Sequence, residues 1–185
     1  MHEGVLFLWR VLECLSKKGN LRVLETGSLE DYERNPTLRS LDKGWLLQET
    51  DEAMIDISNC ELVTKRKPSD EELEGLQFGW KIVKHVKSNA IVFAKQKRIV
   101  GIGAGQMSRI DSVKIATFKS IPNPKDSVMA SDAFFPFRDG IDEAAKEGIT
   151  AVVQPGGSVR DQEVIDAANE HNIAMVFTGM RHFKH

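Results

Sequence analysis

Short apolar segments alternate with segments of helical periodicity from residue 90 to the end of the chain. Apolar runs of strand length lie at Ala90–Ala94, Ile99–Ile102, Val128–Ala130, Ala151–Gln154 and Ile173–Phe177. Helices are expected between them at about 106–120, at 141–147 and after residue 158. This alternation predicts an α/β protein with a largely parallel sheet, in which ligands bind beyond the carboxyl ends of the strands.

Three glycines at alternate positions mark the end of the second run, in the stretch Gly101-Ile102-Gly103-Ala104-Gly105-Gln106. A strand, a glycine turn and a helix in this order can direct free N–H groups and the positive end of the helix dipole at an anion. The stretch is neither of two common nucleotide loops. It lacks the Gly-Lys-Ser/Thr of a phosphate loop, and Gln106 occupies the place of the third glycine in G-x-G-x-x-G. An anion site and a tight turn without a ligand therefore both stay open.

The segment Ser131–Gly140 contains three phenylalanines, a proline and alternating charges. It fits neither an amphipathic helix nor an alternating strand, so we expect an ordered loop. Its aromatic rings either plug the end of the core or form a wall for a flat ligand. A third loop, Pro155-Gly156-Gly157, precedes Ser158-x-x-Asp161, which predicts a capping box at the start of a helix. All three loops follow the carboxyl ends of strands, which favours a ligand site.

We expect a lead-in of residues 1–67, made of a helix, short strands and a polar arm, followed by an α/β domain of residues 68–185. In the lead-in we expect a helix at Val5–Lys17, strands at Leu21–Leu24, Gly44–Glu49 and Glu61–Thr64, and a polar arm at Thr26–Lys43. The domain begins with a helix that runs from Ser69 to about Lys87. Ser69 and Glu72 have the spacing of a capping box at its start.

The composition excludes several classes of function. The 185 residues are 41% hydrophobic and 28% charged, and their interspersed charges sum to −2, which argues against a nucleic-acid partner. No apolar run approaches the roughly 18 residues of a membrane span. The N-terminal apolar run is too short for a secretory signal. Cys14 and Cys60 form no C-x-x-C motif, so we expect free thiols and a cytoplasmic protein.

Four stretches carry a resemblance to a known family: Lys87-Ser88-Asn89-Ala90, Gly101 to Arg109, Ser131 to Gly140, and Arg181-His182-Phe183-Lys184-His185. They resemble the C-terminal part of the bifunctional family AICAR transformylase/IMP cyclohydrolase, and the similarity extends from about Asn20 to His185. The resemblance implies a cytidine-deaminase-like fold, with three α/β/α layers and a mostly parallel or mixed sheet. It also implies formyl transfer from the cosubstrate 10-formyltetrahydrofolate to the 5-amine of aminoimidazole carboxamide ribonucleotide, and the chain resembles the second of the family's two tandem copies.

The resemblance also implies which residues bind the substrates. Asn89, Arg109 and Arg181 would contact the ribonucleotide. The folate site would be lined by Ile110, Phe134, Asp139, Ser158 and Val159. No transition metal is expected, since the Pro-Cys-x-x-Cys of zinc deaminases is absent from the sequence. We also expect the replacement of Arg109 to weaken ribonucleotide binding and to leave folding intact, because an arginine in a ligand loop supports little of the core.

The family's catalytic Lys-His pair and its cyclohydrolase domain have no counterpart in this sequence, so the catalytic residues stay unassigned. Lys84-His85 is interpreted as a solvated helix end rather than a substitute pair. Three functions stay open. In the first, the chain is half of a split formyltransferase, acting as a homodimer or with an upstream transformylase half. In the second, it is a non-catalytic nucleotide- or folate-binding module. In the third, it is a fragment without a function of its own. Nucleic acid and membrane are not expected as partners.

Overall fold

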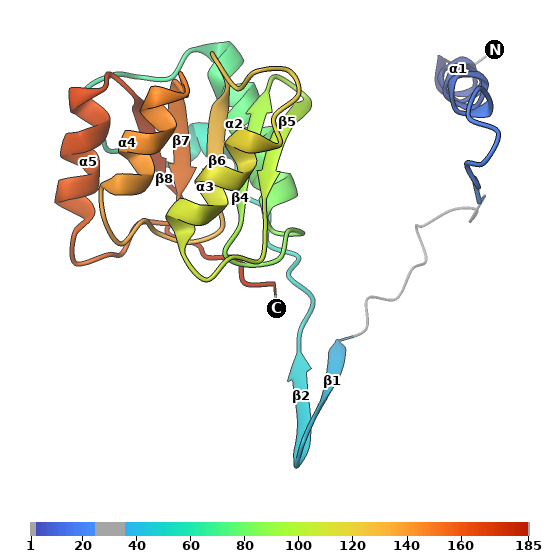
Figure 1. The fold of residues 1–185 in the computed structure, drawn as a ribbon, viewed down its shortest axis with the longest axis horizontal. Helices are drawn as coiled ribbons and strands as arrows, with labels where there is room; N and C mark the ends of the chain where they lie inside the picture. Colours follow the sequence, from blue (N-terminus) through green and yellow to red (C-terminus); the bar gives the residue numbers. More distant parts are fainter. Residues whose placement is uncertain (1–2, 25–35, 185) are drawn as a thin grey trace. The chain divides into compact units, whose positions relative to one another are not determined.

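The computed structural model of the chain describes residues 3–24 and 36–184 (Figure 1). The chain divides into two compact units, Met1–Thr50 and Asp51–His185. This division differs from the predicted boundary after residue 67, since residues 51–67 belong to the larger unit. They do so because Ile57 is buried in its core and Glu61–Leu62 pairs with its sheet. Within the described ranges, none of the helices has the length and apolar character needed to cross a bilayer.

The smaller unit contains one helix and one β-hairpin. Helix α1 (Glu3–Ser16) confirms the helix predicted at Val5–Lys17. Strands β1 (Thr37–Leu41) and β2 (Gly44–Gln48) pair antiparallel, with Leu38 opposite Leu47. Strand β2 confirms the strand predicted at Gly44–Glu49.

Two predictions for this unit are wrong. Leu21–Leu24 is exposed and forms no strand, since no described segment supplies the backbone partner that a strand requires. The stretch Thr26–Lys43 was expected to be a polar arm, but its last part is strand β1. Pairing with β2 satisfies the backbone groups of β1, and this pairing is not visible in the polar composition of the stretch. The part of the arm at residues 25–35 lies outside the described residues.

The larger unit is built on a six-stranded mixed sheet with the order β3-β8-β7-β6-β4-β5. Its strands are β3 (Glu61–Leu62), β4 (Ile91–Lys95), β5 (Arg98–Gly103), β6 (Val128–Ser131), β7 (Ala151–Gln154) and β8 (Ala174–Phe177). Strands β6, β7 and β8 are parallel, whereas β3, β4 and β5 join the sheet by antiparallel pairs. The sheet is therefore mixed, one of the two forms that the sequence analysis expected.

Helices cover both faces of this sheet, which gives three α/β/α layers (Figure 1). Helix α2 (Asp70–Val83) and the short 3₁₀ helix η1 (Ile57–Asn59) pack on one face. The opposite face is covered by α3 (Arg109–Phe118), α4 (Asp139–Lys146) and α5 (Asp161–Glu170). Side chains alternate along the central strands, so each face has its own apolar core. The row Phe93, Met129, Val152 and Met175 lies in register in the core under α3–α5, and the row Val92, Ala130, Val153 and Val176 lies in the core under α2.

The two predicted capping boxes have different outcomes. At α2 the box is confirmed: the Ser69 side chain accepts from the backbone N–H of Glu72, and the Glu72 side chain accepts from that of Ser69. At α5 the prediction is wrong. The helix begins at Asp161, whose Oδ2 accepts from the backbone N–H of Gly157 at 2.6 Å, while Ser158 Oγ accepts from that of Arg160. Both side chains close the preceding turn instead of capping the helix.

Candidate functional site

The three loops singled out in the sequence leave the same edge of the sheet. The carboxyl ends of the parallel strands β6, β7 and β8 lie at this edge, near the end of the chain (Figure 1). Ile91 of β4 pairs with Ser131 of β6 and with Gly103 of β5, so the start of β4 and the end of β5 reach the same edge. The prediction that these loops gather at one edge is confirmed.

The glycine turn is explained largely by packing. A Cβ atom on Gly103 would overlap the carbonyl group of Ser112, because β5 passes directly beneath α3. Gly105 has a φ of 68°, a left-handed conformation that glycine adopts without a steric penalty. The next helix begins only at Arg109, where the Ser108 hydroxyl caps it by accepting from the N–H of Asp111. The glycines thus bring a helix and a strand together, as the interpretation without a ligand requires.

Arg109 is the centre of a buried polar network at this edge. The residue is only 7% exposed, and its Nη1 donates to Ser131 Oγ at 2.8 Å and to Asp132 Oδ1 at 2.5 Å. Its Nη2 donates to Asn89 Oδ1 at 2.9 Å, and Asn89 Nδ2 donates in turn to the carbonyl of Gln106. Arg109 therefore neutralises a buried carboxylate and orients Asn89. The expectation that it supports little of the structure is wrong.

A pocket of about 510 Å³ opens above this network. Six of the eight residues expected to bind substrates line it: Asn89, Arg109, Ile110, Phe134, Asp139 and Arg181. They come from the segment before β4, the start of α3, the loop after β6, the start of α4 and the segment after β8. The fold thus brings together residues that are spread over half of the sequence.

The phenylalanine loop supplies both a plug and a wall, from neighbouring residues. Phe135 is 1% exposed and packs in the core under α3–α5, while its N–H donates to the Gln154 side chain. Phe134 is half-buried and lines the pocket. The guanidinium carbon of Arg181 lies 4.7 Å from the centre of the Phe134 ring, a cation–π arrangement. Phe134 is therefore the aromatic wall, and Phe135 is the plug.

Ser158 and Val159 do not line this pocket. Ser158 is half-buried and Val159 is fully exposed. The two residues follow Gly156 and Gly157, which line a second pocket of about 590 Å³ at the same edge. Arg181 lines both pockets, so its side chain lies where the two adjoin.

Lys84 and His85 lie away from both of these pockets. The Nζ atom of Lys84 donates to the backbone carbonyls of Asp51 and Ala53, so the side chain holds the start of the larger unit against α2. His85 is exposed. Partial burial lowers its pKa below the ordinary value, and the positive charges of Lys84 and Lys184 lower it further. His85 is thus part of a solvated helix end as expected, whereas Lys84 is a structural clamp.

Four residues of this edge were missed by the sequence analysis. Ser131 and Asp132 accept from Arg109, and Asp51 and His182 form a side-chain pair with a Nδ1–Oδ2 distance of 2.5 Å. The position of Asp132 was a usable signal: an acid between a buried strand and an apolar loop needs a cation, and Arg109 is the natural candidate. Asp51 and His182 are 131 positions apart and gave no such signal.

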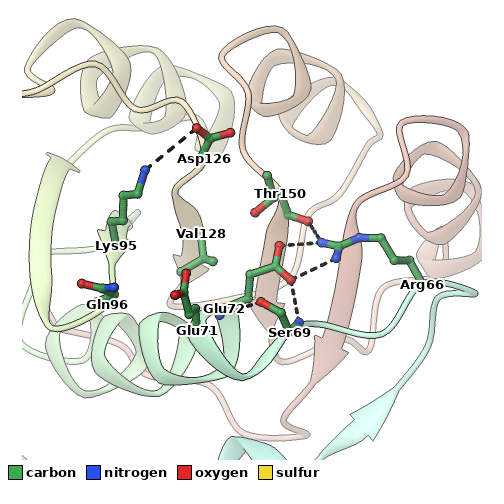
Figure 2. A pocket seen from close by; sticks show the side chains of 9 residues that line it. All are labelled: Arg66, Ser69, Glu71, Glu72, Lys95, Gln96, Asp126, Val128 and Thr150. Carbon is green, nitrogen blue, oxygen red and sulfur yellow. Dashed lines mark hydrogen bonds and ion pairs between the residues drawn. The ribbon is translucent and has the colours of Figure 1, made fainter.

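A further pocket of about 270 Å³ lies at the opposite edge of the sheet, where β6 and β7 begin (Figure 2). Arg66 donates to both carboxylate oxygens of Glu72, at 3.0 and 2.7 Å, and to the Thr150 carbonyl. Burial raises the pKa of Glu72, but hydrogen bonds from Arg66 and from the backbone N–H of Ser69 outweigh it and hold the pKa at about 2. These bonds brace the start of α2 against β7, so the pocket is a structural junction.

Among the described residues, no three His, Cys, Asp or Glu side chains are grouped so that they could hold a metal ion. The comparison with protein families identifies the chain. Residues 7–119 match the model of the family described as AICARFT/IMPCHase bienzyme. The match covers more than half of the chain and includes Asn89, Arg109, Ile110 and the glycine turn. The chain therefore belongs to the AICARFT/IMPCHase bienzyme family of purine biosynthesis.

Proposed function

We propose that the chain forms the C-terminal half of an AICAR transformylase active site. In this function a formyl group passes from 10-formyltetrahydrofolate to the 5-amine of aminoimidazole carboxamide ribonucleotide. One observation carries the proposal. Asn89, Arg109 and Arg181 belong to three segments far apart in the sequence, yet they line one pocket together with the aromatic wall of Phe134.

The geometry supports different roles for the two arginines. Arg109 forms an ion pair with Asp132, so its role in ligand binding is to orient the Asn89 amide by a hydrogen bond. This amide can both donate to and accept from a ligand. Arg181 is exposed and forms no ion pair with any described residue. Its planar fork is therefore available for a phosphate or carboxylate group of a ligand. The Phe134 ring offers a face to the pterin, and the Asp139 carboxylate can accept from pterin N–H groups.

The reaction also needs a base. The substrate amine is conjugated with the carboxamide and is a weak nucleophile, so its proton must be removed as the formyl carbon is attacked. No lysine or histidine of the described chain lines the pocket. We infer that a Lys-His pair comes from a partner, either a second copy in a homodimer or an upstream transformylase half. The alternative function, favoured by the same observation, is a non-catalytic nucleotide- or folate-binding module.

The test combines binding and turnover. Isothermal titration measures binding of the ribonucleotide and of 10-formyltetrahydrofolate to the purified chain, with Arg181→Ala as the control variant. Tetrahydrofolate production is then followed with the chain alone and with cell extract from which the chain has been removed. Turnover only in the mixture supports the split enzyme, and binding without turnover in either case supports the module. Turnover by the chain alone contradicts the missing base, and failure to bind either ligand refutes the site.

A further inference from the structure

We propose that residues 181–184 form a strap across the pocket edge and that His182 is the positioning residue that anchors it. The identity of the ligand that this strap helps to bind rests on the proposed function. His182 is not among the residues that line the pocket. Its role is to hold Arg181 and Phe183, which both line the pocket, at the correct place.

Backbone hydrogen bonds tie the strap to two loops of the site. The N–H of His182 donates to the carbonyl of Asp132 at 2.9 Å, and the N–H of Ser88 donates to the carbonyl of Lys184 at 2.9 Å. The N–H of Lys184 donates to Ser88 Oγ at 3.3 Å. Asp132 and the neighbour of Ser88, Asn89, are both acceptors of the Arg109 guanidinium. The strap therefore joins the two sides of the Arg109 network.

The side chains of the strap alternate in direction. Arg181 and Phe183 are exposed to the pocket, whereas His182 is 1% exposed. The His182 ring lies against Trp80 of α2, with 4.6 Å between the ring centres. Its Nδ1 is 2.5 Å from Asp51 Oδ2, and because a carboxylate only accepts, Nδ1 carries the proton. Of the described strap residues, His182 is thus the one whose side chain is fully buried.

The partner of His182, Asp51, is itself held in place by a hydrogen bond. Asp51 is held by the Nζ atom of Lys84, which donates to the Asp51 carbonyl at 3.1 Å. His182 thereby connects the strap to α2 twice, directly through Trp80 and indirectly through Asp51 and Lys84. Without this ring the strap loses its fully buried side chain, and a segment with fewer buried contacts opens more easily. Opening of the strap would carry Arg181 away from Phe134.

The effect on ribonucleotide binding depends on the fraction of molecules in which the strap is closed. If the strap is closed in only a tenth of the molecules, the apparent ribonucleotide affinity falls about ten-fold, since the dissociation constant is divided by the competent fraction. We therefore expect His182→Ala to raise Kd, and a rise on the order of ten-fold corresponds to a strap that is closed in a tenth of the molecules. His182→Phe, which keeps a ring against Trp80 and loses the bond to Asp51, should have a smaller effect. The matched control is His171→Ala, because His171 also pairs with an aspartate, Asp142, but lines none of the pockets.

The decisive measurement is a double-mutant cycle with Arg181→Ala, read as the Kd for aminoimidazole carboxamide ribonucleotide. Because His182 holds Phe183 as well as Arg181, His182→Ala or His182→Phe should weaken binding in the wild-type background and weaken it less, but measurably, in Arg181→Ala. An equal loss in both backgrounds, or no loss in either, overturns the proposal. Amide hydrogen exchange of residues 180–184 tests the strap without a ligand, and exchange should be faster in the His182 variants than in the wild type. If the wild-type chain does not bind the ribonucleotide, the proposed function fails. Unchanged exchange in the His182 variants overturns the strap as well.

Discussion

Replacement of Arg109 by methionine should destabilise the larger unit strongly. Methionine keeps much of the side-chain volume and removes the positive charge that faces Asp132. The Asp132 side chain is 1% exposed, and its Oδ2 has no hydrogen-bond partner among the described residues. The other acceptors of Arg109 lose less. The Ser131 hydroxyl keeps its bond to the Ala133 carbonyl, and Asn89 is only half-buried, so water can replace its lost donor.

The expected loss of unfolding free energy follows from the Asp132 charge, which stays buried after the substitution. Removing one partner of a buried ion pair costs roughly 3–5 kcal/mol, because the remaining charge is left without compensation. Removing both partners is often close to neutral. Asp132→Leu should therefore recover much of the loss when it is added to Arg109→Met. We expect a coupling free energy on the order of 2 kcal/mol or more between the two positions, at the upper part of the range for contacting residues.

Urea denaturation followed by tryptophan fluorescence measures these values. The chain has three tryptophans, of which Trp9 and Trp45 are exposed and Trp80 is buried. Replacing Trp9 and Trp45 by phenylalanine in every variant makes the signal report on Trp80 and hence on the larger unit. A loss below about 1 kcal/mol in Arg109→Met, or strictly additive effects in the double variant, would refute the buried ion pair as a support of the fold.

Three further predictions follow from the packing and the charges. Phe135→Ala should cost roughly 3–5 kcal/mol of unfolding free energy, whereas Phe134→Ala should leave the melting temperature nearly unchanged and weaken folate binding by roughly 0.5–1.5 kcal/mol; equal melting temperatures would contradict the assignment of plug and wall. Gly103→Ala should give insoluble or unfolded protein in an expression and circular dichroism test, because β5 leaves no space for a Cβ atom under α3, and a normally folded variant would disprove this close contact. The pKa of Glu72 is about 2 in the folded chain and 4.5 ordinarily, so its ion pair with Arg66 stabilises the fold above pH 4.5 and is lost as the pH falls toward 2. The free energy of unfolding, measured by urea denaturation, should therefore fall more steeply over this pH range in the wild type than in Glu72→Gln. The same pH dependence in both proteins would contradict this role of the ion pair.

The sequence by itself determined the order of strands and helices from residue 68 onward and the edge of the sheet at which three loops gather. Apolar runs of strand length, helical periodicity and the Ser69–Glu72 capping box act over a few neighbouring residues, so they can be read locally. The three loops were correctly expected at one edge, because the alternation of strands and helices from residue 90 predicts parallel strands. The eight expected binding residues were named by the resemblance; six of them line one pocket, and their binding role stays a prediction.

Tertiary structure decided the directions of β3 and β4, the burial of Phe135 rather than Phe134, and the pairing of Asp51 with His182. Each depends on groups distant in the sequence: β3 pairs with β8, Phe135 donates to Gln154 across 19 positions, and Asp51 pairs with His182 across 131. Sequence spacing shows which residue types are present but not which of them share a buried volume. A buried charge must find its partner there, because desolvation leaves it no other compensation.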